Sequence, residues 1–116
     1  MSFFDSLFGK SAPSIDPAQA SQILAEKPAP ILIDVREPVE FEQAHVAGAR
    51  LIPLGQIGSR LSEIPTGRRV LVICATGSRS SVAAKQLAQA GYDVLNVNGG
   101  VMGWMRQGLP LKTKGR

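Results

Sequence analysis

Residues 70–80 read VLVICATGSRS, four apolar residues followed by a short polar loop. An apolar run of this length is typical of a strand buried on both faces of a parallel sheet. The loop opens on Cys74, the only cysteine of the chain. A helix is predicted after it, from about 78 to 90, and its inward-facing side chains would be Val82, Ala83, Leu87 and Ala90. The segment therefore predicts a strand, a loop and a helix in direct succession.

Strands and helices continue to alternate on both sides of this segment. Further strands are predicted at 31–35, 50–52 and 94–97. Helices are predicted from Asp16-Pro17 to Lys27-Pro28 and at 37–44, 56–61 and 101–107. This order predicts an α/β domain with a mostly parallel central sheet flanked by helices. In such domains ligands bind beyond the carboxyl ends of the strands, and Cys74 occupies such a position.

The composition suits a small globular protein. The 116 residues predict one domain at 14–111, with an N-terminal arm and linker at 1–13 and a basic C-terminal tail at 112–116. Apolar residues make up 44% and charged residues 19%, as in a soluble domain. A single cysteine permits no intramolecular disulfide, and a thiol-based function would favour the reducing cytoplasm. One cysteine and one histidine are too few for a closed structural zinc site, so no metal is expected.

Charge and hydropathy argue against two classes of partner. The formal net charge of +4 comes from scattered residues and aromatics are only 5%, whereas nucleic-acid binding favours a basic stripe with interleaved aromatics. No apolar run approaches the roughly 20 residues of an integral membrane span. The arm carries Phe3, Phe4, Leu7 and Phe8 but lacks the basic start of a secretory signal. We interpret the arm as a segment that packs on the domain, with an interfacial anchor or partner-docking helix as the alternative.

The loop after the strand has the composition of a site that activates a thiol. A free thiol with a pKa near 8.5 is only about 3% ionised at pH 7, although the thiolate is the reactive form. Backbone N–H groups of a loop that curls ahead of a helix converge on the sulfur, and the helix dipole adds partial positive charge. Gly77 permits the curl and Arg79 adds a full charge. A buried structural cysteine is the alternative, but polar and cationic neighbours are poor core material.

This loop and further motifs resemble the rhodanese domain family. Four residues separate Cys74 from Arg79-Ser80, as in the family's active-site loop. The other motifs are Asp34-Val35-Arg36-Glu37, Phe41 with His45-Val46-Ala47-Gly48-Ala49, Ile52-Pro53, Gly91-Tyr92, and Gly99-Gly100 with Gly103-Trp104. The resemblance implies a rhodanese-like fold in which Cys74 is the nucleophile. It also implies a substrate-binding loop made of Ala75, Thr76, Gly77, Ser78, Arg79 and Ser80.

The resemblance implies a sulfurtransferase of the thiosulfate-using kind. In that family the cysteine attacks the sulfane sulfur of thiosulfate, releases sulfite and becomes a persulfide, and a thiol or cyanide then collects the sulfur. No cofactor is implied beyond the bound sulfur. Many thiosulfate-using members carry a basic residue beside the cysteine, where this chain has Ala75. A protein persulfide, or another small sulfane donor, is therefore a second donor class.

Several residues outside the loop are interpreted as structural. Asp34 and Arg36 would form a charge pair near the site. The only histidine, His45, would be a hydrogen-bonded structural residue in preference to a general base. Gly99 and Gly100 would make a turn, and Met102 and Met105 would fill gaps in the packing.

Two other functions remain possible at this point. One is a sulfur-relay carrier or partner-binding module that does not turn over. The other is a cysteine-dependent phosphatase or arsenate reductase, whose loop also cradles an anion. That loop places five residues between cysteine and arginine, one more than here, so it leaves more room for a tetrahedral oxyanion. The physiological donor, the acceptor and the oligomeric state are left open by the sequence.

Overall fold

A computed structural model describes residues 12–114 and contains a five-stranded sheet whose neighbouring strands all run parallel. The strand order is β1-β6-β5-β2-β4. The strands are β1 (Ser14–Ile15), β2 (Ile31–Asp34), β4 (Arg50–Leu51), β5 (Val70–Ile73) and β6 (Val94–Val97). Every residue of the three central strands is buried, as the apolar runs in the sequence predict. The predicted α/β class with a mostly parallel sheet is confirmed.

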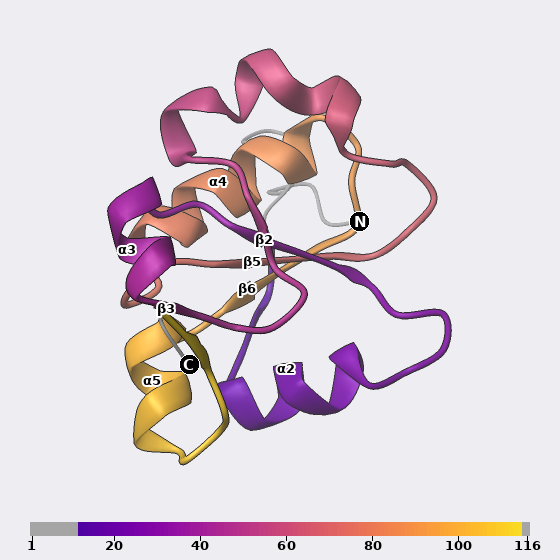
Figure 1. Cartoon of the computed structure of the whole chain (residues 1–116). Helices are drawn as coiled ribbons and strands as arrows, with labels where there is room; N and C mark the ends of the chain where they lie inside the picture. Colours follow the sequence, from indigo (N-terminus) through magenta and orange to yellow (C-terminus); the bar gives the residue numbers. More distant parts are fainter. Residues whose placement is uncertain (1–11, 115–116) are drawn as a thin grey trace.

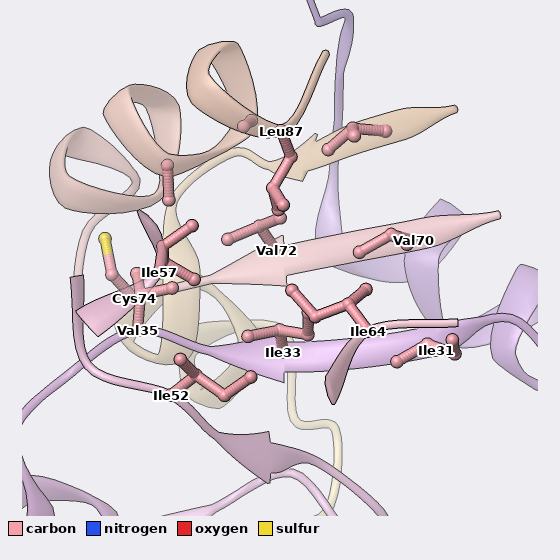
Figure 2. Packing of buried hydrophobic residues seen from close by; sticks show 13 residues of the cluster. Ile31, Ile33, Val35, Ile52, Ile57, Ile64, Val70, Val72, Cys74 and Leu87 are labelled. Atoms are coloured by element: carbon pink, nitrogen blue, oxygen red, sulfur yellow. The ribbon is translucent and has the colours of Figure 1, made fainter. Parts of the chain in front are cut away.

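Helices cover both faces of this sheet (Figure 1). One face packs against α4 (Ser78–Gln89) and the 3₁₀ segments η1 (Leu54–Gln56) and η2 (Gly58–Glu63). The other packs against α2 (Pro17–Leu24) and α5 (Gly100–Arg106). Figure 2 shows the core beneath α4, where Leu87 lies over Val72 and the sulfur of Cys74 ends the cluster. Among residues 12–114, no helix has the length and apolar character needed to cross a membrane.

Capping side chains explain where two of the helices begin. The carboxylate of Asp16 accepts the N–H of Gln19 at 2.8 Å, and the Gln19 side chain accepts the N–H of Asp16 at 3.0 Å. In α3 (Pro38–Gln43) the Glu40 carboxylate likewise accepts the N–H of Glu37 at 2.9 Å. Both helices start on proline, whose missing N–H costs nothing at that position. Capping of α3 therefore holds the Glu40 carboxylate close to the end of β2.

The two strands β2 and β5 send the chain in opposite directions. After β2 it continues through α3 to β4 at one edge, and after β5 it continues through α4 to β6 on the other side. Such a reversal leaves a crevice at the carboxyl ends of the two strands, where parallel α/β sheets bind their ligands. Asp34 is paired in register with Ile73. Arg36 and Cys74, which follow these two residues, therefore both lie at the crevice.

The inward face of α4 differs from the prediction. Val82 is 58% exposed and Ala90 is exposed as well, whereas Ala84 and Ala88 are buried. The buried stripe consists of Ser80, Ala83, Ala84, Leu87 and Ala88. This stripe follows the 3.6-residue period of a helix, and Val82 falls outside it although its side chain is apolar. Ala90 is the C-cap that follows the last helical residue, Gln89.

Short strands complete the fold at two places that the sequence did not predict. β1 joins the edge of the main sheet beside β6, at the predicted start of the domain, where the sequence indicated no strand. β3 (Ala44–His45) pairs antiparallel with β7 (Lys112–Thr113), so the first residues of the basic tail lie against the end of α3. Strands of two residues are too short to show a period in the sequence. Residues 1–11 of the predicted arm lie outside the described residues.

The corrected face of α4 can be tested by placing the same residue at two neighbouring positions. Ala83→Leu should lower the free energy of unfolding by about 1–3 kcal/mol, because Ala83 is fully buried and the added atoms overpack the core. Val82→Leu should stay within about 0.5 kcal/mol of the parent, because Val82 faces solvent. Urea denaturation measures both values. Equal losses would show that Val82 belongs to the core after all.

Candidate functional site

Cys74 lies directly after β5, with its sulfur enclosed by the start of α4. The side chain is fully buried and takes part in the core cluster with Val35 and Ile57 (Figure 2). The Sγ atom accepts the N–H of Gly77 at 3.1 Å and the hydroxyl of Ser80 at 3.3 Å. Gly77 caps α4 with a φ of +106°, which places its N–H toward the sulfur and favours glycine. The loop thus curls around the thiol, as the sequence predicted.

Hydrogen bonds outweigh burial in setting the acidity of this thiol. Burial by itself would raise the pKa of Cys74 because it disfavours the thiolate. The Ser80 hydroxyl and the backbone N–H groups of Ser80, Gly77 and Thr76 oppose this effect, and the net result is a lowered pKa. The donors are neutral groups at the start of a helix, so the thiolate is stabilised by dipoles.

The beginning of α5 is pressed against the backbone of the cysteine loop. The N–H of Val101 donates to the carbonyl of Cys74 at 2.8 Å, and the N–H of Met102 donates to the carbonyl of Ala75 at 2.9 Å. A Cβ on Gly100 would clash with the carbonyl oxygen of Cys74. Gly100 is therefore required for this close approach, which is more than the turn that the sequence suggested. The sequence did not reveal this requirement, because it arises from a contact between the start of α5 and the cysteine loop, which are distant in the chain.

Asp34 and Arg36 form the predicted charge pair beside the loop. The Arg36 guanidinium donates to the Asp34 carboxylate at 2.8–3.1 Å, and both side chains are almost fully buried. Arg36 also donates to the carbonyl of Ala44 at 2.7 Å. The pair therefore ties the end of β2 to the end of α3 and orders that side of the crevice.

Arg79 has a partner that the sequence did not predict. Its guanidinium donates to both carboxylate oxygens of Glu40, at 2.8 and 2.9 Å. This ion pair lowers the pKa of Glu40 to about 2 and raises the pKa of Arg79. The positive charge of Arg79, which was expected to stabilise the Cys74 thiolate, is thus largely compensated by Glu40. Neutral hydrogen-bond donors are the main groups that lower the pKa of Cys74. The spacing of Glu37 and Glu40 is that of a capping box, a signal that could have drawn attention to Glu40 but not to its partner.

The remaining predicted residues lie at the edge of the loop or in its support. Thr76 and Ser78 are exposed, with their hydroxyl oxygens 3.5 Å apart, and we call them the rim. His45 contacts the carbonyl of Phe41 through Nδ1 at 2.8 Å, and the two rings stack with centroids 3.8 Å apart. Both contacts hold the His45 ring against α3. Asn96 on β6 is a further support, because its amide donates to the carbonyl of Gly77 at 3.4 Å.

Comparison with known proteins identifies the family to which the chain belongs. The family model described as the rhodanese-like domain matches residues 16–107. The chain belongs to the rhodanese-like domain family. A protein from Allochromatium vinosum named as a sulfurtransferase is 42% identical over 98 residues, which cover 84% of this chain and 92% of that protein. Membership of a rhodanese-like sulfurtransferase family is therefore shown.

Two further comparisons extend this result. The crystal structure of a rhodanese-related protein from Thermoplasma volcanium has a TM-score of 0.80 at 30% identity and covers 86% of this chain and 97% of that chain. A Bacillus subtilis protein named "Putative sulfur carrier protein YrkF" is 38% identical over 74 residues, 63% of this chain and 40% of that protein. Relatives of this chain thus carry names that describe different roles.

Ser80→Ala tests whether the hydroxyl of this rhodanese-like domain activates the thiol. The variant should raise the pKa of Cys74, because one hydrogen bond to the thiolate is lost. Its alkylation rate at pH 7 should fall by roughly tenfold, which corresponds to the about 1.5 kcal/mol of a hydrogen bond to a charged group. The rate of reaction with a small alkylating reagent, followed against pH, measures both effects. Ser81→Ala, at the exposed neighbouring position, should behave like the parent. Coincident pH curves for the Ser80 variant and the parent would assign the hydroxyl no such role.

Proposed function

We propose that this rhodanese-like domain transfers sulfane sulfur through a persulfide on Cys74. The observation that carries the proposal is the set of donors around Sγ, namely the Gly77 N–H at 3.1 Å and the Ser80 hydroxyl at 3.3 Å. These donors lower the pKa of the thiol in spite of its burial. The relative named as a sulfurtransferase supports the same activity.

With thiosulfate as donor, transfer takes two balanced steps. The Cys74 thiolate attacks the outer sulfur, a new S–S bond forms, and the old S–S bond breaks with its electron pair leaving on sulfite. The persulfide anion on Cys74 then gives its outer sulfur to an acceptor. Cyanide leaves as thiocyanate, or a thiol leaves as a new persulfide, and the Cys74 thiolate is regenerated. No redox partner is needed at either step.

The same neutral donors would stabilise the persulfide anion, because the negative charge of this anion lies on a sulfur atom that the loop surrounds. Cys74 is enclosed in this conformation, so the proposal requires a small movement of the exposed rim residues when a donor enters. We propose small sulfur donors with thiol or cyanide acceptors, and a protein donor or acceptor as the second possibility. A free, activated thiol suits a reducing compartment, and the proposed location is the cytoplasm.

A sulfur-relay carrier is a second candidate, favoured by the Bacillus subtilis relative that is named as a sulfur carrier protein. A carrier would use the same loop to hold the persulfide, but it would deliver the sulfur to one protein. The two functions differ in turnover. A transferase releases many equivalents of thiocyanate with thiosulfate and cyanide, whereas a dedicated carrier stops after about one.

Cys74→Ser should fold like the parent and lose sulfur transfer completely, because a hydroxyl cannot form the persulfide. Mass spectrometry of the intact protein after thiosulfate treatment should show the mass of one added sulfur on the parent only. Thiocyanate formation should be lost in parallel, and urea denaturation checks that the variant is folded. Sulfur uptake by the serine variant would refute a covalent intermediate on Cys74.

Thiosulfate itself is expected to bind weakly, because Ala75 supplies no charge and Arg79 is held by Glu40. Ala75→Arg should lower the KM for this dianion about fivefold with kcat nearly unchanged, as expected for a gain of about 1 kcal/mol at a partly exposed position. Steady-state kinetics at low ionic strength measure the change, and added salt should remove most of it. An unchanged KM at low salt would mean that charge near Ala75 does not limit thiosulfate binding.

A further inference from the structure

We propose that the favoured donor is a small organic persulfide whose carbon chain binds in a pocket beside the cysteine loop. The inference rests on the proposed transfer through Cys74 and specifies its substrate class. The pocket has a volume of about 300 Å³ and lies between α3, the loop and α5. We call it the methionine pocket, and its uncharged lining consists of Gln43, Ala44, Ala75, Val101, Met102 and Met105.

The methionine pocket adjoins the reactive residue through the backbone. Ala75 follows Cys74 in the chain and lines the pocket itself. Val101 and Met102 also line it, and their N–H groups donate to the carbonyls of Cys74 and Ala75 at 2.8 and 2.9 Å. Cys74 is fully buried and does not line the pocket, so the proposal requires the carbon chain of a donor to extend past Ala75 into it.

The pocket offers no uncompensated charge among the described residues that line it. Its two ionised side chains are Arg36 and Glu40. Arg36 is paired with Asp34 at 2.8 Å, and Glu40 is paired with Arg79 at 2.8 and 2.9 Å. An inorganic dianion would find no free cation there, whereas a neutral carbon chain needs none. Charge complementarity thus favours an organic donor over thiosulfate.

Two exposed methionines supply the apolar contact surface. Met102 is 46% exposed and Met105 is 53% exposed, although both are large apolar side chains. They do not fill gaps in the core, which corrects the expectation from sequence. Exposed apolar side chains beside a reactive group are typical of a binding site, and the unbranched methionine adapts to ligands of different shape. The volume lies at the lower limit for small-molecule pockets, which suits a compact organic group.

The transfer step is balanced for such a donor. The Cys74 thiolate attacks the outer sulfur of R–S–SH, and a bond forms between the two sulfur atoms. The S–S bond of the donor breaks, and its electron pair leaves on the thiolate R–S⁻. The proton stays with the transferred sulfur, so the products are the Cys74 persulfide and one organic thiolate. The group R remains in the methionine pocket until it is released.

A series of straight-chain alkyl persulfides of increasing length tests the proposal directly. The second-order rate of Cys74 persulfide formation, followed by mass spectrometry of the full chain, should rise about fourfold for each added methylene until the pocket is filled. That fold-change corresponds to about 0.8 kcal/mol for each buried methylene. Thiosulfate serves as the reference donor and should react more slowly than the longer alkyl persulfides. Equal rates along the series would overturn the inference, whereas absence of any Cys74 persulfide would overturn the proposed function instead.

Matched polar replacements test whether the methionine pocket causes the dependence on chain length. Met102→Gln with Met105→Gln keeps the side-chain size and should reduce the rate gain for each added methylene from about fourfold to less than twofold. Val82→Thr is the control, because Val82 is an equally exposed apolar residue that does not line the pocket. This control should retain the dependence of the parent. If the rate of the double variant still rises about fourfold for each methylene, the carbon chain binds elsewhere and the assignment is refuted. A protein persulfide that reacts faster than every alkyl persulfide would refute it as well.

Discussion

Pairing between β2 and β5 is the constraint on which the site depends. The N–H of Val35 donates to the carbonyl of Ile73 at 3.0 Å, which extends the ladder just beyond the end of β2. The two strands therefore end at the same level, and the chain leaves them in opposite directions. The cysteine loop and α3 consequently face each other across the crevice. Their contact, between Glu40 and Arg79, joins residues 39 positions apart in the chain.

Neutral hydrogen-bond donors are the main groups that lower the pKa of the Cys74 thiol. Burial opposes ionisation of Cys74, and the Ser80 hydroxyl with three backbone N–H groups reverses the balance. These donors belong to the loop and to the first turn of α4, so the fold that buries the sulfur also supplies its hydrogen bonds. Arg79 is then available for pairing with Glu40, and this ion pair fixes α3 against α4. The sequence predicted backbone donors together with a full charge from Arg79, and the ion pair with Glu40 largely compensates that charge.

The sequence predicted features that depend on neighbouring residues and missed those that depend on distant ones. Apolar runs predicted the central strands, the Asp16 and Gln19 spacing predicted the start of α2, and the loop composition predicted a curl around Cys74. The partner of Glu40 and the role of Gly100 could not be predicted in this way. Each arises where segments far apart in the chain come into contact. The choice of Val82 as a core residue failed because it followed hydropathy and not the helical period.

Reactivity and donor choice are assigned to different parts of the site. The hydrogen bonds to Sγ come mainly from backbone and from the buried Ser80, so they constrain the loop's shape more than its outer side chains. Ala75 and Met102 project beside the loop while their backbone groups hold it to α5. Their side chains can therefore change the charge and size of the adjoining pocket without altering the thiol. In this chain both are uncharged, and the nearby arginines are paired, so the same activated cysteine is presented to a neutral pocket. Selection among donors then depends on the carbon chain attached to the sulfur, because every sulfane donor presents the same atom to Cys74.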